Sequence, residues 1–107
     1  MSNRRFFMIV SEATGMALDV GRGDTGNSAV MRRVHDGEGQ VFYRDGSVIR
    51  VAIFGRDKVL DLARDTRNIL VWEAHGGTNQ SWVDRDDGTI RSEGSDLCFD
   101  VEGGSTD

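Results

Sequence analysis

Two runs of polar and aromatic side chains, 40 residues apart, carry groups of this chain that are suited to holding a ligand. They are RRVHDGEGQVF at 32–42 and WEAHGGTNQSW at 72–82. Each run contains an imidazole, a glutamine amide and a closing aromatic ring, which together offer hydrogen-bonding groups and a flat apolar face. The pairs in register are His35 and His75, Gln40 and Gln80, and Phe42 and Trp82. This constant spacing indicates one supersecondary unit that is used more than once.

Carboxylates and turns repeat together with these runs. An aspartate stands between apolar residues in ALDV, VLDL and CFDV, at 17–20, 59–62 and 98–101. Asp-Gly pairs occur in RDGSVIR at 44–50 and in RDDGTIR at 85–91. An Asp-Gly pair readily adopts the positive φ of a tight hairpin turn. Each unit is therefore expected to contain an Asp-bearing strand, a polar loop and a hairpin.

Short apolar segments separated by Gly, Asp, Asn and Ser clusters predict an all-β chain. Units of about forty residues with roughly four strands each favour three-fold packing, which is β-trefoil geometry. We expect a single domain with repeat one at about 5–47, repeat two at about 48–88 and a partial repeat three at about 89–107. The third repeat lacks a counterpart of the 72–82 run. Truncation, or completion by a missing C-terminal segment or a partner such as a homodimer, is preferred over true degeneracy.

Residues at equivalent phases of the repeats predict the core. The expected core residues are Leu18, Val20, Val30, Phe42, Ile49, Leu60, Leu62, Leu70, Trp82, Ile90, Leu97 and Phe99. The segment Phe6–Val10 is too short for the core of a signal peptide and is expected to form the first strand. Cytoplasmic residence or unconventional release is expected on that ground.

Composition excludes several classes of function. The formal net charge of −5 disfavours binding to a phosphate backbone, so no nucleic-acid partner is expected. No segment has the roughly 20 apolar residues of a membrane span, so no membrane insertion is expected. The single cysteine, Cys98, cannot form an intrachain disulfide, and neither histidine has a close partner at metal-ligand spacing. Neither a metal nor another cofactor is expected.

The repeated motifs resemble those of the ricin B-chain type of β-trefoil lectin, over nearly the whole chain. That family carries a QxW signature, which is intact in QSW at 80–82 and varied in QVF at 40–42. It also carries an LDV-like strand with a sugar-binding Asp and a DGTIR hairpin, as seen in VLDL and RDDGTIR. The resemblance implies a non-enzymatic lectin for galactose or N-acetylgalactosamine, with shallow pockets in which a carboxylate, a ring and an amide meet the sugar.

Repeat two has every element in the family's register. The resemblance implies that Asp61 accepts hydrogen bonds from sugar hydroxyls, that Trp72 stacks on the sugar and that Asn79 is the amide partner. His75 and Gln80 are expected either to add a hydroxyl contact or to hold the loop and Asp61 in place. Two alternatives stay open: burial of Trp72 beside its apolar neighbours, and a purely structural role for Asp61 in holding backbone amides.

The other repeats are expected to be degenerate or partial. Repeat one keeps Asp19 and His35, but Arg32 takes the place of the aromatic ring and Gly39 the place of the amide. Its site is expected to be inactive or altered. Repeat three offers Asp100 alone.

Other functions remain possible for such a chain. It could be a carbohydrate-binding module of a larger glycosidase or toxin, or a protein-interaction trefoil that binds no sugar. A glycoside hydrolase needs two carboxylates across the sugar, whereas the proposed pocket offers one Asp opposite an Asn. Turnover of aryl galactosides and binding to a glycan array would separate these alternatives.

Overall fold

The computed structural model describes residues 5–35, 37–53, 55, 57–63, 65–66, 68–94, 98–99 and 101–105, with side chains up to residue 94. The described chain consists of strands and two short 3-10 helices. The strands are β1 Phe6–Ser11, β2 Ala17–Asp19, β3 Val30–Arg32, β4 Phe42–Asp45, β5 Val48–Val51, β6 Lys58–Leu62, β7 Ile69–Glu73, β8 Trp82–Asp84, β9 Ile90–Ser92, β10 Cys98–Phe99 and β11 Val101–Ser105. The 3-10 helices are η1 Glu38–Gln40 and η2 Thr78–Gln80.

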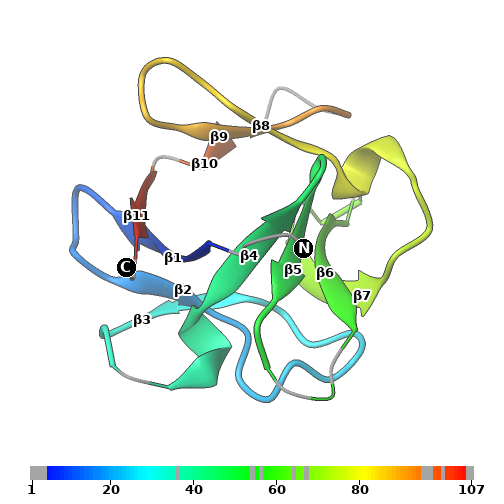
Figure 1. Ribbon diagram of the computed structural model, residues 1–107, viewed down its shortest axis with the longest axis horizontal. Coiled ribbons are helices and arrows are strands. Elements are labelled where there is room, and N and C mark those ends of the chain that lie inside the picture. Colours follow the sequence, from blue (N-terminus) through cyan, green and yellow to red (C-terminus); the bar gives the residue numbers. More distant parts are fainter. Residues whose placement is uncertain are drawn as a thin grey trace.

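The strands follow the predicted repeat, and the fold is a β-trefoil (Figure 1). One sheet has the order β3-β2-β1-β4-β5-β6-β7, and a second has the order β10-β9-β8. The two Asp-Gly hairpins form as expected, joining β4 to β5 and β8 to β9. Gly46 and Gly88 have φ of 62° and 87° in these turns, which explains why glycine stands there. The prediction that the first strand lies at Phe6–Val10 is also confirmed.

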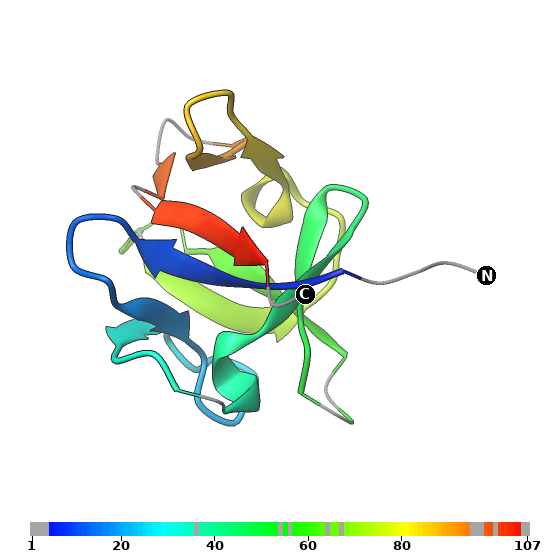
Figure 2. The same cartoon turned by 60° about the vertical axis from the view of Figure 1, so that its left-hand side comes forward.

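Strand β11 lies along the first strand of the chain. It pairs antiparallel with β1, from Phe7 opposite Ser105 to Ser11 opposite Val101. Figure 2 shows β11 in red running beside β1 in blue. This edge of β1, which a partial third repeat could have left open, is therefore hydrogen-bonded within the chain.

The core lies where the repeats meet, and most of the expected residues are in it. Buried as predicted are Leu18, Val20, Phe42, Ile49, Leu60, Leu62, Trp82 and Ile90. Ile9, Val51, Val59 and Val71 are also buried, and they lie on β1, β5, β6 and β7 of the larger sheet.

Two core predictions were wrong. Val30 is 42% exposed, because β3 pairs with β2 at the end of the sheet and its three residues all face solvent. Leu70 is only partly buried, and it lies on the same face of β7 as the exposed Trp72. Leu97 and the side chain of Phe99 lie outside the described part of the structure.

The aromatic residue of the QxW signature is structural. Trp82 is 2% exposed, and its Nε1–H donates to the carbonyl of Leu60 at 3.1 Å. Its backbone N–H donates to the carbonyl of Ser47 at 2.8 Å, in the β4–β5 hairpin. Trp82 thus links β8 to two other elements of the core. In the described chain, no helix is long and apolar enough to cross a membrane.

Candidate functional site

In repeat two, a carboxylate and an indole lie on one face of a two-stranded ribbon. The register of β6 and β7 places Asp61 opposite Leu70, and Val59 opposite Trp72. Because side chains alternate along a strand, these four residues share a face, and Trp72 is the diagonal neighbour of Asp61. Trp72 is 42% exposed. The alternative of a buried Trp72 is therefore wrong, although Val59 opposite it is fully buried.

Helix η2 brings two amides onto the carboxylate of Asp61. Asn79 donates through Nδ2 to Oδ1 of Asp61 at 2.8 Å. Gln80 donates through Nε2 to Oδ2 of Asp61 at 2.8 Å and to the carbonyl of Glu73 at 2.8 Å. The Oε1 atom of Gln80 accepts the backbone N–H of His75 at 2.9 Å. The fully buried Gln80 thus fixes both the loop and the orientation of Asp61.

The imidazole of His75 covers the remaining side of the carboxylate. Its Nδ1 accepts the N–H of Gly77 at 3.1 Å, so the neutral ring carries its proton on Nε2. That Nε2 lies 3.5 Å from Oδ2 of Asp61. Of the two roles expected for His75 and Gln80, holding the loop and Asp61 is the one that these contacts support.

Asp61 retains the capacity to accept a ligand hydrogen bond. An ionised carboxylate oxygen accepts about two hydrogen bonds, and within the described residues Oδ1 accepts one, from Asn79. Asp61 is 7% exposed, and the half-exposed Trp72 stands on the same face. Asn79, Gln80 and His75 therefore surround the carboxylate of Asp61, and the strand register places Trp72 diagonal to Asp61 on the same face.

Repeat one has the same scaffold. Asp19 lies opposite Val30 on β3, so Arg32 takes the place that Trp72 has in repeat two. Gln40 donates to Oδ2 of Asp19 at 3.1 Å and to the carbonyl of Arg33 at 2.8 Å. Its Oε1 accepts the backbone N–H of His35 at 2.9 Å. The Gln of the signature thus holds the Asp in both repeats.

The second donor to the carboxylate differs between the repeats. In repeat one, the backbone N–H of Gly21 donates to Oδ1 of Asp19 at 2.7 Å, where Asn79 serves Asp61 in repeat two. Gly39 occupies the position of Asn79, and a Cβ there would lie 2.5 Å from the carbonyl oxygen of Gly21. The chain after β2 has moved into the space that an amide side chain would need.

His35 lies closer to its carboxylate than His75 does. Its Nε2 is 3.1 Å from Oδ2 of Asp19, and its Nδ1 accepts the N–H of Gly37 at 2.7 Å. Burial by itself raises the pKa of Asp19, but hydrogen bonds from Gly21, Gln40 and His35 outweigh it and hold that pKa below its ordinary value of 3.8. Asp19 is therefore an ionised acceptor at neutral pH.

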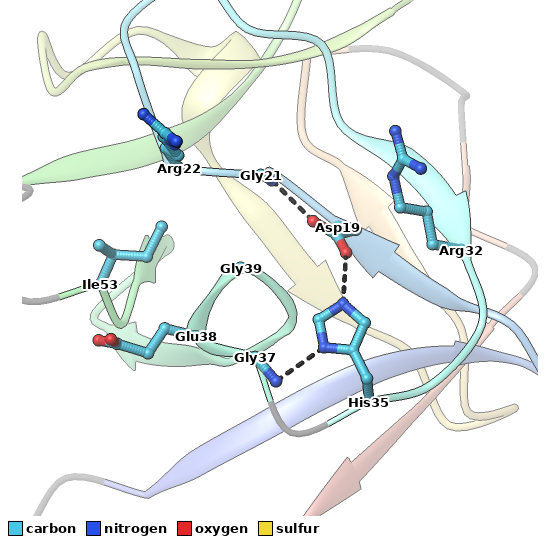
Figure 3. A pocket seen from close by; sticks show the side chains of 9 residues that line it. All are labelled: Asp19, Gly21, Arg22, Arg32, His35, Gly37, Glu38, Gly39 and Ile53. Atoms are coloured by element: carbon cyan, nitrogen blue, oxygen red, sulfur yellow. Dashed lines mark hydrogen bonds and ion pairs between the residues drawn. The ribbon is translucent and has the colours of Figure 1, made fainter.

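A cavity of about 590 Å³ opens over the Asp19 carboxylate (Figure 3). It is lined by Asp19, Gly21, Arg22, Arg32, His35, Gly37, Glu38, Gly39 and Ile53. The sequence predicted an inactive or altered site. The residues of this site differ from those of repeat two, and the site contains a cavity. Asp100, the expected remnant in repeat three, lies outside the described residues.

The chain belongs to the ricin-type β-trefoil lectin domain family, whose family model matches residues 5–107. The same fold occurs in several solved structures. The hemolytic lectin CEL-III aligns with a TM-score of 0.75 at 18% identity, over 94% of this chain and 26% of that one. The C-half of the earthworm R-type lectin, in complex with GalNAc, aligns with a TM-score of 0.72 at 20% identity, over 94% and 85%.

A third structure is an enzyme chain. The exo-β-1,3-galactanase 1,3Gal43A from Clostridium thermocellum aligns with a TM-score of 0.63 at 20% identity, over 99% of this chain and 28% of that one. At these identities the likeness concerns the fold alone. Among curated proteins, none matches this chain significantly.

Proposed function

We propose that this chain is a non-enzymatic lectin domain that binds galactose- or N-acetylgalactosamine-type glycans through the repeat-two site. Membership of the family supports carbohydrate binding as the general activity. The observation that carries the specific proposal is the arrangement of Trp72 and Asp61, an exposed indole diagonal to a fixed carboxylate on one face of β6 and β7.

The arrangement suits a hexose for physical reasons. A hexose has an apolar C–H face, which an indole covers, and hydroxyl edges, which need acceptors and donors. Asp61 supplies acceptors only, and Asn79 supplies an amide oxygen, while its Nδ2 donates to Asp61 at 2.8 Å and to the carbonyl of Leu62 at 3.4 Å. Two neighbouring hydroxyls can be read by this pair, which distinguishes axial from equatorial placement. The earthworm lectin structure with GalNAc supports this choice of sugar class.

Binding of one monosaccharide to one such site is expected to be weak. A shallow polar contact of this size corresponds to roughly 4 to 6 kcal/mol, or dissociation constants in the millimolar to submillimolar range. Useful affinity would then require several sites to engage one glycan surface. Glycoconjugates that display many terminal galactosides are the expected partners.

Retention on immobilised galactose tests the proposal. Trp72→Ala is expected to abolish retention while the circular dichroism spectrum and Tm stay close to those of the parent protein. Asp61→Asn is also expected to abolish retention, with a lower Tm, because an amide cannot accept from both Asn79 and Gln80. Matched controls are Val83→Ala, which shortens an apolar side chain that is 39% exposed on β8, and Asp86→Asn, which removes an exposed carboxylate from the β8–β9 turn. Retention of either site variant at the level of its control would refute the repeat-two site.

A second candidate is a carbohydrate-binding module of a longer enzyme or toxin. This chain spans 28% of the galactanase and 26% of the hemolytic lectin, so the fold occurs as one part of larger proteins. The sugar site would be the same, and the chain itself would have no turnover. Assay of this chain on aryl galactosides is expected to release no aglycone. A glycan array on which nothing binds would instead favour a trefoil that recognises proteins.

A further inference from the structure

Repeat one places a cation where repeat two has its indole. The register of β2 and β3 puts Arg32 two residues beyond Val30, the partner of Asp19, as Trp72 stands two residues beyond Leu70. Arg32 is exposed and lines the 590 Å³ cavity. Within the described part of the chain, its side chain makes no ion pair or hydrogen bond. Its guanidinium is therefore in position to meet a ligand.

The cavity also carries a fixed acceptor and an apolar wall. Oδ1 of Asp19 receives the Gly21 N–H, while Oδ2 receives Gln40 and His35, which leaves acceptor capacity on Oδ1. Figure 3 shows Arg22 and Arg32 on either side of Asp19, with Ile53 across the cavity from His35. A ligand held here can give a hydroxyl hydrogen to Asp19 and rest an apolar face on Ile53.

An arginine in this place selects for a negatively charged ligand. Guanidinium offers two parallel N–H donors that match a carboxylate, and such charge-assisted pairs are about twice as strong as neutral hydrogen bonds. Asp19 is itself ionised and repels a ligand carboxylate, so the ligand's charge must lie on the Arg32 side of the cavity, away from Asp19. Glu38, also in the lining, makes the arginine side the favourable place for the ligand's charge.

We propose that the repeat-one cavity binds a carboxylate-bearing sugar such as a hexuronate, with Arg32 pairing with the carboxylate and Asp19 accepting a hydroxyl. The proposal rests on the proposed lectin function, because it uses the same scaffold of Asp and Gln. It differs in assigning a second site of different specificity to the repeat that has no aromatic ring.

Three small ligands of matched shape test this inference: galactose, galacturonate and the methyl ester of galacturonate. They are titrated into the Trp72→Ala protein, in which the repeat-two site is silenced, and binding is followed by amide chemical shifts in NMR. Galacturonate is expected to shift amides of residues 19–22 and 35–39, and the uncharged ester and galactose to bind about tenfold more weakly. Affinity for galacturonate is expected to fall as salt increases.

Arginine variants in the same background identify the cation. Arg32→Ala is expected to weaken galacturonate by about tenfold, and Arg32→Trp is expected to reverse the preference toward galactose. Arg5→Ala removes the same charge from an exposed residue outside the lining and should leave affinity unchanged. The inference would be overturned if Arg32→Ala and Arg5→Ala bound galacturonate equally well. It would also be overturned if the parent protein bound galacturonate and the Trp72→Ala protein did not, because binding would then belong to the repeat-two site. If the parent protein does not bind galactose but galacturonate binding still depends on Arg32, only the repeat-two proposal is refuted.

Discussion

Asn79 donates from Nδ2 to Oδ1 of Asp61 at 2.8 Å, so the amide proposed to meet the sugar also holds the carboxylate proposed to bind it. In repeat one a backbone N–H does the same for Asp19. The two sites therefore share a carboxylate held on both oxygens and differ in what supplies the second donor. This difference leads to distinct expectations for the two repeats.

Removing the amide should harm binding more than stability. Asn79→Ala deletes a hydrogen bond to a charged group, and we expect galactose affinity to fall by about tenfold. Asn79→Asp should be worse, because a second carboxylate would face Asp61. Affinity is measured by titration calorimetry, with Asn68→Ala in the β6–β7 turn as the control. Wild-type affinity in Asn79→Ala would contradict the role given to this amide.

Gly39 should not tolerate a side chain. A Cβ there would lie 2.5 Å from the carbonyl oxygen of Gly21 and 2.9 Å from Oδ1 of Asp19, and both neighbours are held in place. We expect Gly39→Ala to lower the free energy of unfolding by about 1 to 3 kcal/mol, as overpacking does. Urea denaturation of both proteins measures this change in the free energy of unfolding. Gly15→Ala, which has open space but a φ of 72°, reports the cost of backbone strain alone.

The two tryptophans should separate stability from binding. Trp82→Ala removes a fully packed indole and the donor to Leu60, and a loss of about 3 to 5 kcal/mol is expected. Trp72→Ala removes a half-exposed ring and should cost little stability while abolishing binding. Thermal unfolding and galactose retention are measured on both variants. A large fall in Tm for Trp72→Ala would mean that the ring serves packing instead.

Asp19 should contribute to the loss of stability of the folded protein as pH falls. Because its folded pKa is lowered, the unfolded chain binds more protons at low pH. Its stabilisation is therefore present above its unfolded pKa of 3.8 and is lost as pH falls through the lower folded value. Tm measured from about pH 5 to about pH 2 should fall less steeply for Asp19→Asn than for the parent protein. Parallel curves would contradict the lowered pKa.

Much of the fold followed from the sequence. The 40-residue spacing of His35 and His75, and of Gln40 and Gln80, predicted the repeated unit, and the Asp-Gly pairs predicted its hairpins. These features are local, because a turn depends on a few neighbouring residues and a repeat is visible as a spacing. Val30 was misjudged since nothing local shows that β3 lies at the end of the sheet.

The sites needed the tertiary structure. The sequence placed Asp61 and Gln80 in one repeat. Only the folded chain shows that Gln80, 19 residues further along, donates a hydrogen bond to Oδ2 of Asp61. It likewise shows that the backbone at Gly21 fills the place of a missing amide and that the cavity over Asp19 remains open. The sequence determined which groups are present and how often they recur. Which donor meets which oxygen was decided by loops folding back over strands, because hydrogen bonds depend on distances between atoms and not on spacing along the chain.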